Sequence, residues 1–198
     1  MATCLTSSHK GIFMLTYQVN DFKSFSQKFY DDCVNRIDFF SVQCTCGHKG
    51  CLTRHGFYNR NVRTDNGTVT LSILRVRCSE CGRTHAVLLS SMVPFSQISV
   101  LNQFDIILGN GQRVMDNNPD INESSCSHIR RSYRFFFFEF LRGENTPLSD
   151  IRQIISVCLN KLKRQFMQMK CSMKLKSSQI ILLRNILICQ NHITSVNP

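Results

Sequence analysis

The sequence predicts an α+β protein in which a β-hairpin, preceded by a lead-in strand and helix, is followed by helices. Two observations predict this class. Polar and apolar residues alternate on both sides of an Asp65-Asn66-Gly67 turn, as they do in paired strands. After residue 97, apolar residues recur every three or four positions, as on one face of a helix. We expect three regions, which comprise residues 1–96, 97–143 and 148–198.

The first 40 residues predict a strand and a helix. Ile12–Gln18 is apolar enough for a strand, and Asn20 or Asp21 can cap the helix that follows. Packing of this helix on the hairpin would supply the apolar burial that a lone hairpin lacks. The helix face that we expect in the core consists of Phe22, Phe25 and Phe29.

Two cysteine-rich knots flank the hairpin. The first carries Cys44, Cys46 and Cys51, and the second is Cys78-Ser-Glu-Cys81-Gly. Four thiolates that meet at one point bind Zn²⁺ tetrahedrally, and such a closed site is structural. The sequence therefore predicts a zinc ribbon that holds one structural zinc ion.

The choice of the four ligands depends on the hairpin register. If Asp65 pairs with Thr68, Cys81 faces Leu52, and this favours the neighbouring Cys51 as a ligand. In the same register His55 faces Cys78 and is a less favoured rival. The predicted ligands are Cys46, Cys51, Cys78 and Cys81, with Cys44 as the alternative to Cys51.

Three helices are expected after the hairpin. They are Ile98–Leu108, Gln112–Asn117, and a long helix from Asn122 or Ser124 to about Leu141. This order, with polar and basic residues near the start of the third helix, is typical of a helix-turn-helix. The alternative is an ordinary helical hairpin with a solvated basic face. The side chains of Phe135–Phe138 project from all sides of the helix. Its C-terminal end is therefore expected to be buried on both faces or at a partner.

The C-terminal region predicts a further helix, from Leu148 to about Met169. Its apolar stripe, Ile151–Met169, is either core or a homodimer seam, to which the Phe135–Phe138 surface would also contribute. The net charge is +11, and no Asp or Glu follows Asp150. A basic chain of this kind is expected to bind a polyanion, of which duplex DNA is the expected one.

Two sets of side chains are candidates for contact with DNA. Residues at the start and along the outer side of the third helix would read bases, and basic residues elsewhere would contact phosphates. The first set is Ser125, Ser127, His128, Arg130, Arg131 and Arg134. The second set is Lys161, Lys163, Arg164, Lys170, Arg54, Arg60 and Arg63.

Other functional classes lack their signals. There is no signal-peptide pattern and no apolar stretch long enough to cross a membrane, so the eleven cysteines suggest a reducing cytoplasm. If the chain binds DNA, we expect it to be associated with the nucleoid in that compartment. No phosphate-binding loop, serine nucleophile elbow or cluster of metal-binding carboxylates is visible, so we expect no catalysis.

The residues of the two knots carry a family resemblance. Cys44-x-Cys-Gly-x-x-x-Cys-Leu-x-Arg-His-Gly, then Arg75-Val-Arg-Cys-x-x-Cys-Gly-Arg-Thr-His and Val93-Pro-Phe-Ser-Gln, resemble a family of small bacterial proteins. That family combines an uncharacterised zinc-binding domain with a helix-turn-helix and is akin to the zinc-ribbon N-terminal domains of insertion-sequence transposases. The resemblance implies a DNA-binding protein of mobile-element ancestry and implies no particular reaction.

The sequence thus predicts a zinc- and DNA-binding protein of transposase-like ancestry that lacks the transposition chemistry. One alternative is a zinc-stabilised adaptor that binds another protein. The other is an accessory subunit of a transposase or nuclease supplied by a separate chain.

Overall fold

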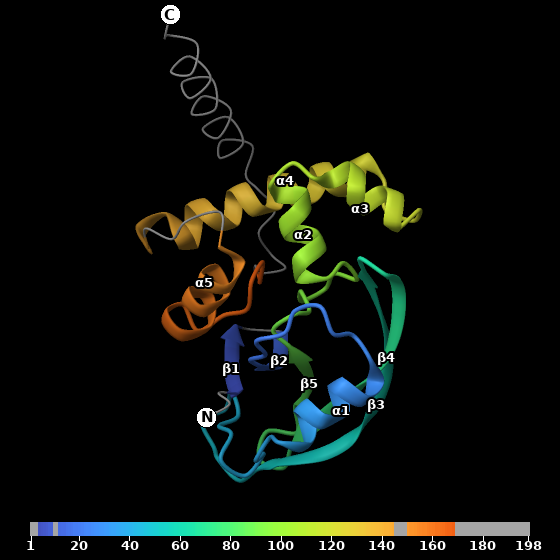
Figure 1. The fold of residues 1–198 in the computed structure, drawn as a ribbon. Helices are drawn as coiled ribbons and strands as arrows, with labels where there is room; N and C mark the ends of the chain where they lie inside the picture. Colours follow the sequence, from blue (N-terminus) through green and yellow to red (C-terminus); the bar gives the residue numbers. More distant parts are fainter. Residues whose placement is uncertain (1–3, 10–11, 145–149, 169–198) are drawn as a thin grey trace, which may run out of the picture. The chain divides into compact units, whose positions relative to one another are not determined.

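The structure is a computed structural model that describes residues 4–9, 12–144 and 150–168. The fold is mixed α+β, as the sequence predicts, with a sheet and a group of helices (Figure 1). Within the described residues, no helix is both long and apolar enough to cross a membrane. The sequence prediction of a C-terminal segment beyond residue 168, including Lys170, lies outside the described residues.

A five-stranded sheet has the strand order β1-β2-β5-β4-β3. Strands β2 and β5 are parallel, and the other neighbours are antiparallel. The predicted strand at Ile12 is present as β2. Residues 84–89, for which the sequence analysis predicts no strand, form the central strand β5, because Val87, Leu88 and Leu89 are buried where this strand lies between β2 and β4. The strands are β1 (Cys4–His9), β2 (Ile12–Tyr17), β3 (Leu52–Thr64), β4 (Gly67–Cys78) and β5 (Thr84–Leu89).

The β3–β4 hairpin forms as predicted, but its register differs from the expected one. Thr64 pairs with Gly67, so the turn residues are Asp65 and Asn66, and Gly67 alone takes a positive φ of 95°. This is the geometry of a turn followed by a glycine bulge, which accepts the same Asp-Asn-Gly sequence as a two-residue primed turn. The change of turn shifts every pair along the hairpin.

A second irregularity shifts the register again near the cysteines. The pairing slips between Arg54 and Gly56, where Gly56 has a φ of 146°. Cys78 therefore pairs with Leu52 and does not face His55, which is exposed at the bulge. The expected pairing of His55 with Cys78 was wrong because two bulges move the strands past each other.

Helix α1 (Gln27–Asn35) covers the backbone edge of β4 beyond the end of β5. Its cap is Ser26, whose hydroxyl accepts from the amide of Phe29, rather than the expected Asn20 or Asp21. Gln27 bonds both the amide and the carbonyl of Ser72, and the Tyr30 hydroxyl donates to Val87 and accepts from Leu74. Polar side chains of α1 thus satisfy strand groups that have no strand partner. In the predicted apolar face, Phe22 is buried, whereas Phe25 and Phe29 are half-buried.

Three helices beyond the hairpin turn pack on one another, close to the predicted bounds. They are α2 (Val100–Ile107), α3 (Gly111–Asn117) and α4 (Glu123–Phe136). The side chain of Asn122 caps α4 by accepting from the amide of Ser125 at 2.9 Å. The shared apolar core, which joins all three helices, consists of Ile98, Ile106, Val114, Ile121, Cys126 and Ile129.

The chain after α4 packs back on the rest of the structure. A π-helical turn, η1 (Phe137–Leu141), and a short 3-10 turn, η2 (Arg142–Glu144), extend α4. Helix α5 (Ile151–Ser156) continues as η3 (Val157–Lys161) and ends at Leu162, well before the expected Met169. Lys163 takes a positive φ of 50°, which a helix cannot accommodate.

The apolar stripe of the last helix lies inside this chain. Ile154, Ile155 and Cys158 are buried, and Phe166 packs edge-on against Phe136 at a ring separation of 5.9 Å. Of the two readings of this stripe, core or dimer seam, the observed packing is that of a core. Gln165 connects this core to the sheet, because its side chain accepts from the hydroxyl of Thr16 and donates to the carbonyl of Leu89.

Candidate metal centre

Four cysteines from two separate loops meet at the open end of the β3–β4 hairpin. Cys44 and Cys46 precede β3, Cys78 is the last residue of β4, and Cys81 lies in the turn before β5. The Sγ atoms of all four lie within 4.8 Å of one another. The sequence-predicted ligands Cys46, Cys78 and Cys81 are thereby brought together, with Cys44 as their fourth neighbour.

Backbone turns aim these thiols at one point. In the first loop, the amide of Cys44 donates to the carbonyl of His48 at 2.8 Å, and the amide of Gly47 donates to the carbonyl of Cys44 at 2.9 Å. In the second loop, the amide of Gly82 donates to the carbonyl of Cys78 at 3.0 Å, and Gly82 has a φ of 69°. A residue with a Cβ is strained at that φ, so glycine allows the chain to turn directly after Cys81.

The sulfur separations match a tetrahedral metal site. Cys44 and Cys81 are 3.8 Å apart at Sγ, and Cys46 and Cys78 are 3.7 Å apart. A tetrahedron with metal–sulfur bonds of about 2.3 Å has edges of about 3.8 Å. A disulfide, in contrast, requires about 2.05 Å between sulfurs, and all four cysteines are free. The cluster could hold a metal ion.

Cys51, the favoured fourth ligand in the sequence analysis, is not a member of this group of four. Its thiol is buried and donates to the carbonyl of His48 at 3.4 Å. The reason is the register. Leu52, rather than His55, lies opposite Cys78, so Cys51 flanks the end of the hairpin and leaves the position near Cys81 to Cys44. The alternative ligand considered from the sequence therefore takes the place of the favoured one.

Two histidines donate to or accept from the clustered sulfurs. His85 of β5, which is fully buried, has its Nε2 atom 3.3 Å from the Sγ of Cys44. His48 has its Nδ1 atom 3.4 Å from the Sγ of Cys46. Imidazole groups in such positions orient metal-bound thiolates without binding the ion themselves. The sequence analysis did not single out His85, although its alternation with Val87 along an apolar strand could have indicated that it points inward.

The environments of the thiols differ. Burial raises the pKa of Cys44 to about 12. The backbone amide and the side chain of His48 lower the pKa of Cys46 to about 6. Burial acts to raise the pKa of Cys78, but this pKa is lowered on balance. The amide of Cys81 donates to the sulfur at 3.4 Å, and neighbouring thiols add to the lowering. Without a metal, the cluster therefore combines groups that hold protons with groups that release them.

Helix α4 presents an exposed polar and basic face opposite its buried face. Ser127, His128, Arg131 and Arg134 are exposed, whereas Cys126 and Ile129 are in the core. Two other predicted contacts are used within the protein. The hydroxyl of Ser125 bonds the capping residue Asn122, and Arg130 bonds Glu123 and the carbonyl of Ile106.

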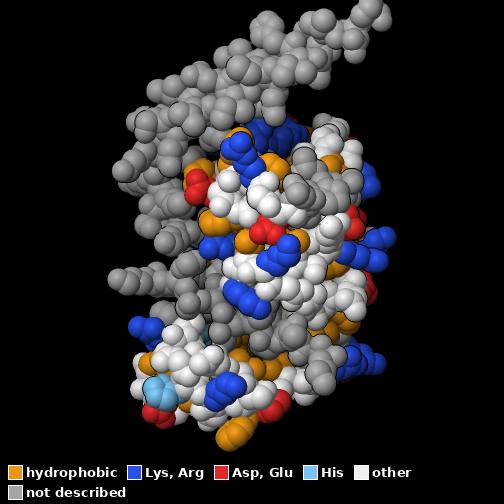
Figure 2. Space-filling model, turned by 90° about the vertical axis from the view of Figure 1, so that its left-hand side faces the viewer, with side chains coloured by type: hydrophobic (Ala, Val, Ile, Leu, Met, Phe, Trp, Pro, Cys, Tyr) orange, Lys and Arg blue, Asp and Glu red, His pale blue; other side chains and the backbone are white. Residues whose placement is uncertain are grey.

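The basic residues predicted to contact phosphates are placed unevenly. Arg60 donates to the carbonyls of Val93 and Ser96, Arg63 pairs with Asp120, and Lys161 pairs with Glu144. Arg164 stacks on Phe140 at 3.7 Å, Arg54 bonds Asn35, and Lys163 is exposed. Figure 2 shows Lys and Arg side chains from top to bottom of one face, with Asp and Glu side chains and with neutral and apolar surface between them.

The comparisons with known proteins identify one domain. Residues 44–131 match the model of a domain of unknown function, DUF6431, and this stretch includes all four clustered cysteines and the first half of α4. No curated protein and no solved structure matches the chain. Residues 44–131 of the chain are thus similar to an uncharacterised domain.

Proposed function

We propose that the protein is a DNA-binding protein stabilised by one structural Zn²⁺ ion. The ligands are Cys44, Cys46, Cys78 and Cys81. Four thiolates at tetrahedral separations suit zinc among the common metal ions, and four protein ligands leave no open position for a substrate. The ion joins the two loops at the open end of the hairpin and in this way completes a zinc ribbon.

The DNA-binding surface in this proposal is the exposed face of α4. The observation that carries it is the contrast between the two sides of this helix, with Cys126 and Ile129 in the three-helix core and Arg131 and Arg134 exposed. The order of helices α2, α3 and α4, with a turn before α4, supports a helix-turn-helix, a motif whose last helix enters the major groove.

The ancestry in this proposal is transposase-like, and the chain binds DNA without carrying transposition chemistry. The cysteine motifs and their association with packed helices support this reading. The base-reading residues are Ser127, His128, Arg131 and Arg134, because these are exposed on α4, and Arg130 instead serves to hold α4 against α2.

The experiment that tests the proposal is selection of duplexes from random DNA by the full-length zinc-loaded chain. We expect one sequence family to be enriched, and Arg131→Gln to reduce discrimination against a scrambled duplex by about 1–3 kcal/mol. Arg36→Gln is the matched control, since Arg36 is an exposed cation at the end of α1. Absence of salt-sensitive duplex binding, together with dimerisation or capture of a protein partner, would favour the adaptor function instead.

A further inference from the structure

Two arginines of β4 form an exposed pair that the proposed function does not use. Arg75 and Arg77 are two residues apart on one strand, so both side chains lie on the same face of the sheet. Both are exposed. In the part of the chain that the structure describes, the ion pairs involve Arg63, Arg113, Arg130 and Lys161, and no carboxylate pairs with Arg75 or Arg77.

The residues directly paired with these two arginines across the sheet are small. Directly opposite residues in an antiparallel ladder share a face. Arg75 pairs with Gly56 in β3 and Ala86 in β5, and Arg77 pairs with Thr53 and Thr84. None of these neighbours is large or acidic, and none can cover or neutralise the arginines.

Arg75 is also held in place. Its guanidinium group lies 5.9 Å from the ring centre of Tyr58 and donates to the carbonyl of Phe57 at 3.4 Å. A cation fixed over an aromatic ring loses less side-chain entropy when it binds an anion. The planar guanidinium group remains able to bind a phosphate with two N–H groups.

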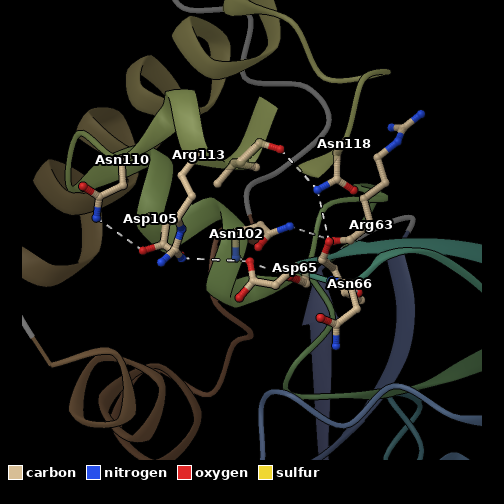
Figure 3. A network of polar contacts seen from close by, with 11 residues as sticks. Arg63, Asp65, Asn66, Asn102, Asp105, Asn110, Arg113 and Asn118 are labelled. Carbon is tan, nitrogen blue, oxygen red and sulfur yellow. Dashed lines mark hydrogen bonds and ion pairs between the residues drawn. The ribbon is translucent and has the colours of Figure 1, made fainter. Parts of the chain in front are cut away.

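A polar network joins the hairpin to the helices at its other end (Figure 3). Asn102 of α2 donates to the carbonyl of Arg63 at 3.3 Å, and Asn118, the residue after α3, donates to the carbonyl of Thr64 at 3.1 Å. Arg113 of α3 lies between Asp105 and Asp65. Because both asparagines are buried, these bonds fix the hairpin against α2 and α3, and through their shared core against α4.

We propose that Arg75 and Arg77 contact the sugar-phosphate backbone of duplex DNA at a point away from the segment bound by α4. This inference rests on the proposed DNA-binding function and adds a second contact to it. The unpaired charge and the small residues paired across the sheet favour a phosphate backbone as the occupant. From Gly67 to Arg77 the strand extends roughly 30 Å, which is close to the roughly 34 Å of one DNA turn. The hairpin would therefore lengthen the bound segment without reading its sequence.

The test compares salt dependence on two mixed-sequence DNA stems, each closed by a hairpin loop, of about 8 base pairs (about 27 Å) and about 30 base pairs, for the zinc-loaded chain. Fluorescence anisotropy at several NaCl concentrations gives the slope of log Kd against log salt concentration. On the longer duplex, R75Q/R77Q should flatten the slope by about two units, because two phosphate contacts are lost. On the shorter duplex, which cannot reach both surfaces, it should leave the slope unchanged.

R36Q/R152Q is the control, because it removes the same charge from exposed sites on α1 and α5. Unchanged zinc content and thermal unfolding would show that the R75Q/R77Q variant is folded. An equal slope change in the control, or wild-type behaviour of R75Q/R77Q on both duplexes, would overturn the inference while leaving DNA binding by α4 intact. Failure of the wild-type chain to bind either duplex would overturn the proposed function itself.

Discussion

The two ends of the β3–β4 hairpin are held by different kinds of interaction. At the turn, buried amide side chains of Asn102 and Asn118 bond strand carbonyls next to an apolar helical core. At the open end, residues 45–50 include no buried residue, and the groups that come together there are four thiols. Protein groups alone therefore complete the first end, whereas at the second end a metal ion could bind the four sulfurs together.

From this difference between the two ends of the hairpin, we expect the largest change in stability on loss of the metal. Cys78→Ser should abolish zinc binding and unfold the open end, because a structural zinc site contributes folding free energy of order 10 kcal/mol. Hydrogen exchange should become fast in residues 44–56 and 74–82 and remain slow in residues 98–130. Measurement of zinc by mass spectrometry checks the ligand assignment directly. Stoichiometric zinc in a Cys78→Ser/Cys81→Ser variant would contradict it.

The next effect sharpens the identity of the fourth ligand. Cys44→Ser should lower zinc affinity severely, because it removes a thiolate from a four-thiolate site. Cys51→Ser should retain one zinc ion per chain, since Cys51 lies outside the group of four clustered sulfurs. Zinc competition with a chromophoric chelator separates the two variants. The reverse order of affinities would restore the ligand set favoured by the hairpin register expected from the sequence.

This difference between Cys44 and Cys51 shows what the sequence could and could not predict. The spacing of the cysteines and the Asp65-Asn66-Gly67 turn were enough to predict a hairpin that brings two knots together. The same three turn residues fit two different turns, and the choice between them moves Cys78 relative to β3. Local sequence does not decide between these turns, because the carbonyl of Thr64 also accepts from the buried amide of Asn118, 54 residues away, and this contact helps to select one of them.

The helices show a similar division. Apolar periodicity and capping residues predicted α2, α3 and α4 well, because these signals are local to each helix. Periodicity also predicted that the last helix would continue to about Met169, but it ends at Leu162. There Gln165 turns inward to bond Thr16 and Leu89, which are more than 70 residues away in the sequence. Contacts of this kind cannot be inferred from spacing alone.

At the turn end, substitution should have a smaller effect that leaves the metal in place. Asn118→Ala removes the amide that bonds the carbonyls of Thr64 and Val114. The free energy of unfolding should fall by about 1–3 kcal/mol, because buried carbonyls lose their partner. Zinc content should not change. Asn117→Ala, at the exposed neighbouring position, is the matched control, and an equal loss in both variants would show that the polar network is not the cause.

The smallest effect concerns pH and distinguishes the two ends once more, since only the open end should respond to it strongly. Zinc binds thiolates, so binding releases the proton of Cys44, whose pKa burial raises to about 12 in the metal-free protein. Zinc affinity should therefore fall as the pH falls, by about tenfold per unit for each proton released. Below about pH 6 the dependence should become steeper, because Cys46, with a pKa of about 6, is then protonated in the metal-free protein as well.

His48 sets the pH at which that steepening begins. Its backbone amide and its imidazole lower the pKa of Cys46, and the side-chain contribution is lost in His48→Ala. The steepening should then move to higher pH, while the four ligands and the affinity at high pH remain nearly the same. Chelator competition between pH 5 and pH 8, on wild-type protein and this variant, measures the shift. An unmoved curve would show that the backbone amide alone controls the thiolate of Cys46, and that the imidazole is only a neighbour.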